Sequence, residues 1–237
     1  MPIFPLPASA SIGSPRSTSL PIIRHSVSDQ VLDQLRRKLV RSEFPENSFI
    51  PESQYAQSIG VSRVPVREAL MQLERDGLLT QTTSGTRGKS VVRAFTTNDV
   101  QQISAVRREL EGLAARIAAS SATKDDLTQL QLNIEAFDAA SSVEELAHLD
   151  VQFHELICLS AHQPWLHHAW QTIRWPFETI LVRGFRNYVH ETSLDDSKTA
   201  TPDHTRILEA IRQHDAVTAE TLLRQHISRW EEWDYTA

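Results

Sequence analysis

The sequence has almost no cysteine and no long hydrophobic run, and each absence excludes a class of protein. Its single cysteine, Cys158, cannot form an internal disulfide, which suits a reducing compartment. No apolar stretch approaches the roughly 18 to 20 residues that cross a bilayer. The first twenty residues are broken by prolines and poor in charge, unlike a signal peptide. We therefore expect a cytoplasmic protein without a membrane partner, in which residues 1–20 form a disordered tail.

Charge is unevenly distributed along the chain. The formal net charge of the 237 residues is −6. Residues 22–95 contain 11 lysines and arginines against 8 acidic residues, whereas residues 96–237 contain 12 against 22. A basic front and an acidic rear are expected when only one of two domains faces the phosphates of a nucleic acid. We expect a boundary near residue 95, with a domain over residues 21–95 and another over residues 96–237.

The front of the chain has the order of signals typical of a winged helix-turn-helix. Periodic apolar residues and turn residues predict three helices and a β-hairpin, over residues 27–40, 52–59, 63–76 and 78–95. Ser62 is placed to cap the third helix. Gly60 and Gly77 are placed to end the second and third helices.

The third predicted helix is the candidate for DNA recognition. Arg63 and Arg67 lie four residues apart and share one side of it, facing either solvent or a major groove. Arginine suits the groove because its planar fork can bind guanine or a phosphate. Taken alone, two such arginines are usually only a solvated surface. The basic flank of the first helix adds Arg36 as a further candidate.

The segment IGVSRVPVREALMQLERDGLL, residues 59–79, resembles the recognition segment of the GntR family of bacterial transcription regulators. The resemblance implies that Arg63 and Arg67 contact DNA and that Ser62 and Val64 lie at the groove. It also implies that Gly85 belongs to a wing tip that enters the minor groove. Ser53 departs from relatives that have a DNA-contacting arginine at its position, so the operator sequence does not follow.

The rear of the chain predicts an all-α bundle. Helix signals follow one another with few strand signals, over residues 98–120, 124–140, 143–160, 165–189, 202–213 and 216–233. Ser142 with Glu145 predicts a capping box, and Thr201 is placed to cap the helix that begins at Pro202. Pro176 is expected to kink or split the fourth of these helices. The fold class is therefore mainly α.

Four polar residues can converge inside this bundle. Asp150 and His154 share one helix face, and His204 and His226 lie on two helices joined by a short turn. One carboxylate and three imidazoles suit a borderline divalent ion such as Zn²⁺, Ni²⁺ or Mn²⁺. The alternative is a set of surface or singly satisfied core side chains, and spacing does not choose between the two.

Three segments resemble the signature blocks of the FCD effector domain, the C-terminal half of the FadR subfamily of GntR regulators: residues 106–115, 150–157 and 203–226. In metal-binding members of that subfamily, the resemblance implies, the ligands fall on the four residues above. It also implies that Arg107 points into the cavity and pairs with a carboxylate of the effector, a role that its bidentate fork fits.

The sequence thus predicts a homodimeric transcription regulator, not an enzyme, whose binding to double-stranded operator DNA is controlled by a small organic acid near a divalent metal. A metalloenzyme is the first alternative, but no obvious general base accompanies the proposed site. A regulator for which the metal itself is the signal is the second. It ranks lower because sites without thiolate ligands are less selective.

Overall fold

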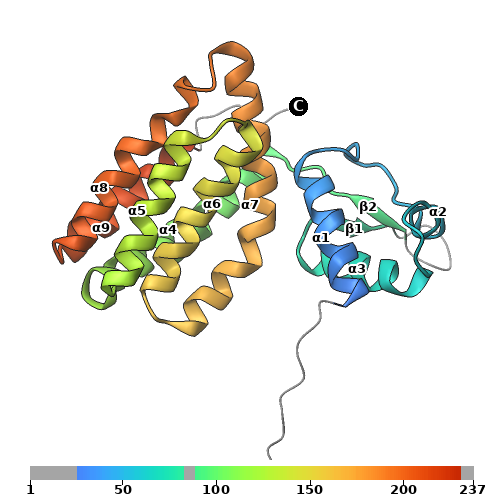
Figure 1. Ribbon diagram of the computed structural model, residues 1–237, viewed down its shortest axis with the longest axis horizontal. Helices are drawn as coiled ribbons and strands as arrows, with labels where there is room; N and C mark the ends of the chain where they lie inside the picture. The colour runs from blue at the N-terminus through green and yellow to red at the C-terminus, as the bar shows by residue number, and fades with distance from the viewer. Residues whose placement is uncertain (1–25, 83–88, 231–237) are drawn as a thin grey trace, which may run out of the picture.

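A computed structural model describes residues 26–82 and 89–230 (Figure 1). Its elements are α1 (Val27–Val40), α2 (Glu52–Ser58), α3 (Arg63–Arg75), β1 (Leu79–Gln81), β2 (Ser90–Val92), α4 (Thr97–Ser121), α5 (Lys124–Ala139), α6 (Val143–Ser160), α7 (Pro164–Glu191), the 3₁₀ helix η1 (Asp196–Ala200), α8 (Thr201–Arg212) and α9 (Ala216–Trp230). The predicted tail and Gly85 of the predicted wing tip lie outside the described residues.

The elements from α1 to β2 form the winged helix-turn-helix that the sequence predicts; we call this unit the head. Ser26 begins α1 with a capping box, in which its hydroxyl and the carboxylate of Asp29 accept each other's backbone N–H. Gly60 and Gly77 have φ angles of 70° and 76°, which allow tight turns after α2 and α3. β1 and β2 pair antiparallel, and the buried side chains of α1, α3 and the hairpin make the core.

The helices from α4 to α9 form the predicted all-α unit, which we call the bundle. α4 packs along α9, and α6 packs between α5 and α7, as Figure 1 shows. Large buried side chains from these helices, among them Phe137, Phe153 and Trp170, fill one continuous core. Among the described helices, none combines the length and the apolar character needed to cross a bilayer.

Helix starts in the bundle differ from the predictions at two places. Ser142 does accept the Glu145 N–H, but the carboxylate of Glu145 accepts from Ser141 instead of returning to Ser142, so no capping box forms. Thr201 does not cap α8, because η1 runs directly into α8 and Thr201 already lies inside the helix. α7 is also not split, since it continues through Pro176.

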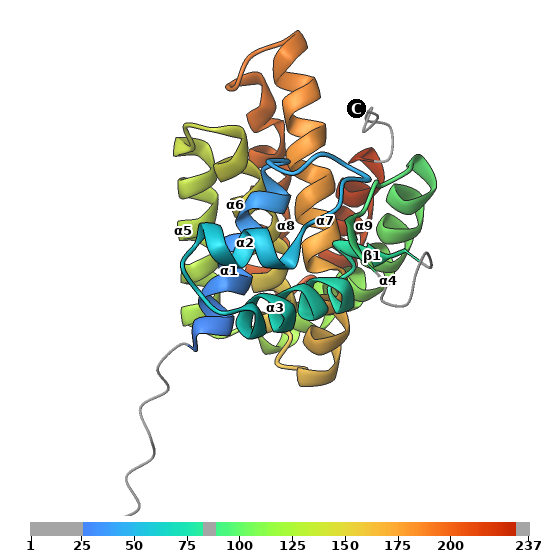
Figure 2. The same ribbon diagram turned by 90° about the vertical axis from the view of Figure 1, so that its right-hand side faces the viewer.

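α7 lies on the side of the bundle that faces the head (Figures 1 and 2). The Arg36 guanidinium of α1 lies 4.6 Å from the ring centre of Trp175 on α7. The same guanidinium binds Asp76 at the end of α3, with 2.6 Å between Nη2 and Oδ2. Further along α7, Arg183 forms an ion pair with Glu46 of the head. The polar contacts named here join head and bundle through α7, and among the described residues Val100 of α4 and Ile180 of α7 are also buried in the core of the head.

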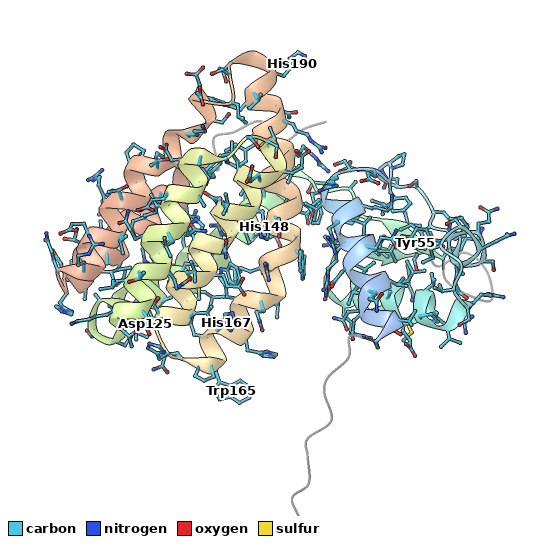
Figure 3. The ribbon with its side chains drawn as sticks, viewed as in Figure 1. Tyr55, Asp125, His148, Trp165, His167 and His190 are labelled. Carbon is cyan, nitrogen blue, oxygen red and sulfur yellow. The ribbon has the colours of Figure 1, made fainter. Side chains whose placement is uncertain are left out.

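The junction is only partly filled by side chains. A cavity of about 410 Å³ lies between α1 on one side and α6 and α7 on the other. His148 of α6 points toward this side of the bundle (Figure 3) and lies 3.2 Å from the carboxylate of Glu178, measured from Nδ1 to Oε1. Open space therefore separates part of α1 from α6 and α7.

Candidate metal centre and DNA-binding surface

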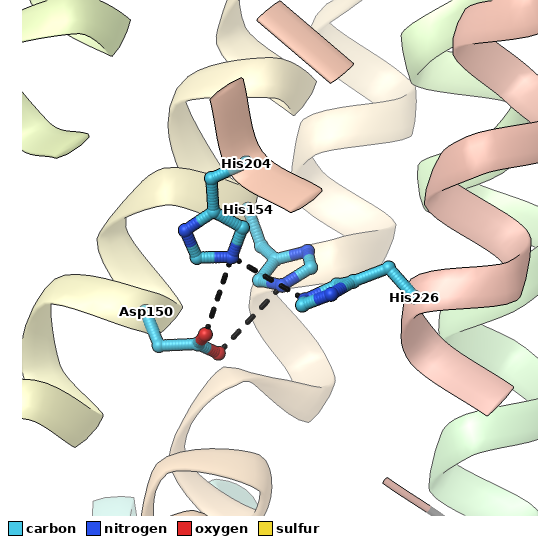
Figure 4. Close-up of side chains that lie close together, drawn as sticks. All are labelled: Asp150, His154, His204 and His226. Atoms are coloured by element: carbon cyan, nitrogen blue, oxygen red, sulfur yellow. Dashed lines mark hydrogen bonds and ion pairs between the residues drawn. The ribbon is translucent and has the colours of Figure 1, made fainter. Parts of the chain in front are cut away.

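The four predicted metal ligands meet in the middle of the bundle (Figure 4). Asp150 and His154 lie one turn apart on α6, while His204 stands near the start of α8 and His226 in the middle of α9. All four are buried, and each offers a ligand atom within 4.8 Å of the others. We call these four residues the buried cluster.

The spacing of the ligand atoms fits a bound divalent ion. His204 Nε2 lies 3.4 Å from Asp150 Oδ1, and His154 Nε2 lies 3.6 Å from Asp150 Oδ2. The Nε2 atoms of His204 and His226 are 3.3 Å apart. A tetrahedral ion with bonds of about 2.0–2.1 Å to nitrogen holds its ligand atoms about 3.3–3.4 Å apart. Small adjustments of these side chains would therefore be enough to coordinate one ion.

Several atoms of the buried cluster lack a hydrogen-bond partner. Both carboxylate oxygens of Asp150, both ring nitrogens of His154 and Nδ1 of His204 are buried without a well-directed hydrogen bond. Leaving a buried polar group unsatisfied costs about 1–3 kcal/mol, so native proteins rarely gather several in one place. A cation at the centre would satisfy the inward-facing atoms together, which supports a metal site over a set of isolated core histidines.

The protonation states also suit a metal site. Burial lowers the pKa of all three histidines, that of His226 to about 3, so the rings are neutral near pH 7. Burial raises the pKa of Asp150, but its close contacts with His204 and His154 outweigh burial and hold that pKa below its ordinary value. Neutral imidazoles and an ionised carboxylate are the forms that bind metals.

Arg107 lies beside the buried cluster and is itself buried. It forms an ion pair with Glu111, one turn along α4, with 2.7 Å between Nε and Oε1. Its guanidinium carbon lies 3.4 Å from the ring centre of Phe177 on α7. Sequence reasoning did not single out Glu111 or Phe177. The four-residue spacing of Arg107 and Glu111 was an available signal for the first, whereas nothing in the sequence points to the second.

A second carboxylate outside the predicted set contacts the buried cluster. Asp203, next to His204 in the chain, places Oδ2 3.4 Å from Nδ1 of His226. Asp203 also pairs with Arg229 and is partly exposed. Hydrogen bonds to the outer nitrogen of a metal-binding histidine orient its ring, so Asp203 is suited to that task at His226.

The predicted DNA-contacting residues of α3 lie on the surface of the head. Arg63 and Arg67 are 57% and 51% exposed, and both contact the carboxylate of Glu52 at the start of α2 at 2.9 Å. Val64 is also exposed. Ser62 precedes the first turn of α3, but its hydroxyl makes no capping hydrogen bond, contrary to the prediction. The structure thus brings Ser62, Arg63, Val64 and Arg67 together at one end of α3.

Arg36 lies elsewhere. Its partner Asp76 follows the last turn of α3, at the opposite end of that helix from Arg63. Only 16% of the Arg36 side chain is exposed, because Trp175 covers it. A DNA contact by Arg36 stays a prediction, and its observed contacts favour a role at the junction between head and bundle.

Comparison with known proteins agrees with both halves of this picture. The sequence matches the description "Bacterial regulatory proteins, gntR family" over residues 27–87 and "FCD domain" over residues 102–229. It is 29% identical over 203 residues to the HTH-type transcriptional regulator YdhC of Bacillus subtilis, covering 84% of this chain and 87% of the relative. It is 28% identical over 221 residues to a probable D-xylose utilization operon transcriptional repressor of Paenarthrobacter nicotinovorans, covering 90% and 91%.

A solved structure has the same fold. E. coli McbR/YncC superimposes with a TM-score of 0.71 at 21% identity, covering 86% of this chain and 94% of that one. The relatives are transcription regulators rather than enzymes. The chain therefore belongs to the GntR family of bacterial regulatory proteins and is a DNA-binding transcription regulator that carries an FCD domain.

Proposed function

We propose that the chain is a homodimeric repressor that binds double-stranded operator DNA through α3 and is controlled by a small organic acid bound beside a divalent metal in the bundle. The observation that carries the control mechanism is the convergence of four buried metal-ligand side chains within reach of Arg107. Two relatives are named as transcriptional repressors, one of them as a probable one, which supports repression. Because operator DNA lies in the bacterial cytoplasm, the protein acts there.

The DNA contacts follow from the exposed end of α3. In a helix-turn-helix the first turns of the recognition helix enter the major groove, and those turns carry Arg63, Val64 and Arg67. Ser62 lies at the same end, and Gly85 is proposed for the minor groove. Two heads in a dimer would read two half-sites of a palindrome, one helical turn apart or a multiple of it.

The effector is expected to carry a carboxylate. Held by Asp150, His154, His204 and His226, a Zn²⁺, Ni²⁺ or Mn²⁺ ion would supply a positive anchor for a carboxylate group. Arg107 donates its Nε and Nη2 hydrogens to Glu111, which leaves Nη1 for a further acceptor. A small organic acid could therefore contact both positive groups at once.

α7 is the element that can transmit effector binding to the head. Trp170 and Phe177 face the Arg107 side of the bundle, where Trp170 donates a hydrogen bond to Glu111. Trp175 and Ile180 of the same helix contact the head, and Ile180 belongs to the core of the head. A shift of α7 that accompanies effector binding would change the orientation of the head. The effect on operator affinity is limited to the effector's preference between the two arrangements.

A second candidate function is regulation by the metal alone. The unsatisfied atoms of Asp150, His154 and His204 favour it, because they make the packing of α6 against α8 depend on the ion. If the organic acid is the signal, metal-loaded protein binds the operator and the acid releases it. If the metal is the signal, adding and removing the ion alone switches operator affinity within the cellular concentration range.

Metal analysis tests the site in the bundle. We expect roughly one divalent ion per purified chain, lost in the His204→Ala/His226→Ala variant. The matched control is His162→Ala/His168→Ala, which removes two exposed histidines and should keep the ion. Circular dichroism checks that each variant is folded. Wild-type protein that stays metal-free after zinc is supplied would refute the metal-anchored mechanism and leave the DNA-binding assignment intact.

DNA binding is tested on a duplex enriched by the wild-type protein from a random-sequence library. We expect Arg63→Ala and Arg67→Ala each to weaken binding by about 1–3 kcal/mol, measured by fluorescence anisotropy. Arg75→Ala is the control, because Arg75 is an exposed arginine at the far end of the same helix. Equal losses for all three variants would mean that α3 contributes only general positive charge rather than specific contacts.

A further inference from the structure

Glu111 occupies an unusual place between the buried cluster and Arg107. It lies on α4, its side chain is fully buried, and its carboxylate faces α6 and α7. A buried carboxylate is costly unless several donors surround it. Glu111 is therefore stabilised there by the groups that it contacts, and these contacts show which side chains its carboxylate can orient.

Four nitrogen atoms from three residues surround the two oxygens of Glu111: three donate hydrogen bonds, and Nδ1 of His154 lies in close contact. Oε1 accepts from Nε of Arg107 at 2.7 Å and from Nε1 of Trp170 at 2.8 Å. Oε2 accepts from Nη2 of Arg107 at 3.3 Å and lies 2.5 Å from Nδ1 of His154. Each oxygen of the carboxylate therefore has two polar neighbours, and the guanidinium of Arg107 balances its negative charge.

The contact with His154 decides which ring nitrogen faces the metal position. A carboxylate beside Nδ1 favours the tautomer with its proton on Nδ1, which leaves the lone pair on Nε2. Nε2 is the nitrogen that faces Asp150, at 3.6 Å from Oδ2. The opposite tautomer would direct an N–H into the buried cluster and compete with an ion.

The contact with Arg107 fixes the guanidinium in the same step. Two of its nitrogens donate to Glu111 while its plane lies against the ring of Phe177. The negative charge of Glu111 also offsets the positive charge of Arg107, which would otherwise repel a cation bound a few side chains away. One carboxylate therefore supports the ion and aims the group proposed to meet the effector.

We infer that Glu111 is a positioning residue that sets the tautomer of His154 for metal binding and holds Arg107 in place beside the ion. The inference rests on the proposed metal-anchored function and deepens it by coupling the ion to the effector-binding arginine. Glu111 does not itself occupy the ligand set. Its counterpart at His226, Asp203, is partly exposed and shared with Arg229, so Glu111 is the more firmly enclosed of the two.

The first test compares Glu111→Gln with Glu109→Gln. An amide keeps the shape of Glu111 but loses the charge and can donate to Nδ1, which favours the wrong tautomer. Zinc affinity, measured by competition with a chromophoric chelator, should fall about 10- to 100-fold in Glu111→Gln. It should not change in Glu109→Gln, because Glu109 is exposed on the same helix and pairs with Arg224. An unchanged affinity in folded Glu111→Gln would overturn the inference.

A second pair of variants separates positioning from simple charge balance, and its double variant buries neither charge. In Arg107→Gln the contact of Glu111 with His154 remains and a positive charge near the ion is removed, so zinc affinity should not fall. In Arg107→Gln/Glu111→Gln neither charge is buried, yet affinity should fall as in the single Glu111 variant. If the double variant binds zinc as well as Arg107→Gln does, Glu111 is only a counterion for Arg107 and the inference fails.

Nitrogen-15 NMR of the histidine rings in metal-free protein supplies a readout that needs no ion. Wild-type His154 should give the signature of a proton on Nδ1, and Glu111→Gln should shift it toward the Nε2 tautomer. Wild-type protein that binds no zinc but shows this shift would remove the metal from the proposed function while keeping the tautomer assignment. If wild-type protein binds zinc but Glu111→Gln leaves the His154 tautomer unchanged, the proposed metal site is kept and the inference about Glu111 fails.

Discussion

The charged side chains on the head and those inside the bundle are arranged for opposite purposes. On α3, Arg63 and Arg67 share the carboxylate of Glu52 in water, where such pairs contribute about 0–1 kcal/mol and exchange easily for another anion. In the bundle, Glu111 and Arg107 are enclosed, and breaking a buried pair costs about 3–5 kcal/mol. The surface of the head is thus built to change partners and the interior of the bundle to keep them.

Arg36 stands between these two cases. It is mostly covered by Trp175 and bound by Asp76, but it lies at the open junction rather than in a core. Its contacts join the DNA-binding unit to the helix that also reaches the Arg107 side of the bundle. The role of Arg36, at the junction or on DNA, is therefore decided by experiment. Three measurements test the difference between head and bundle, and they are given in order of expected effect.

The largest effect is expected from the ion. Added zinc at about 100 to 1,000 times its dissociation constant should raise the free energy of unfolding by about 3–4 kcal/mol, since it binds the folded bundle through residues of α6, α8 and α9. Urea unfolding with EDTA and with zinc measures the difference. His204→Ala/His226→Ala should not respond. An equal response in that variant would mean that the stabilising ion binds outside the buried cluster, which would contradict the proposed role of the bundle interior.

A smaller effect is expected at the junction. Arg36→Gln should lower the free energy of unfolding by about 1.5–3 kcal/mol, the contribution of hydrogen bonds to charged groups, because it removes the bonds to Asp76. The salt dependence of operator binding should stay unchanged. A salt slope reduced by about one unit would instead identify Arg36 as a phosphate contact, as the sequence suggested. Arg37→Gln on the exposed side of α1 is the control for charge.

The smallest effect concerns Glu52. Glu52→Gln should tighten operator binding by less than about 1 kcal/mol, because Arg63 and Arg67 no longer exchange a carboxylate for phosphate. The hydrogen bond from Arg67 lowers the pKa of Glu52, so the carboxylate stays charged at neutral pH. The difference from wild type should disappear only as the pH falls through that lowered pKa. Weaker binding by the variant would mean that Glu52 orients the arginines rather than competing for them.

Much of the fold was predictable because its signals are local. Apolar periodicity and turn glycines predict most helices within a few residues. Asp150 and His154 were predictable as a pair because their spacing places them on one helix face. Glu111 could have been noticed beside Arg107, but its contact with His154 joins α4 to α6 and exists only in the folded bundle. The charge of Arg36 was visible in the sequence and led to the prediction of a DNA contact, which stays a prediction. Its hydrogen bond to Asp76, 40 residues away, could not be predicted because it joins α1 to the end of α3. The prediction that Thr201 caps α8 was wrong because η1 precedes α8 directly, so Thr201 already lies inside the helix.

α7 has a consequence for how such regulators can diversify. The residues proposed to read DNA lie on α3, and those proposed to read the effector lie mostly on α4, α6, α8 and α9, so either set can vary without touching the other. On α7, by contrast, Trp175 contacts Arg36 of the head and Phe177, two positions further along, contacts Arg107 of the bundle. Natural variation should therefore be freest at the two ends of the signalling route. Variation should be most constrained on α7, where a substitution that suits a new effector must also preserve the contacts with the head.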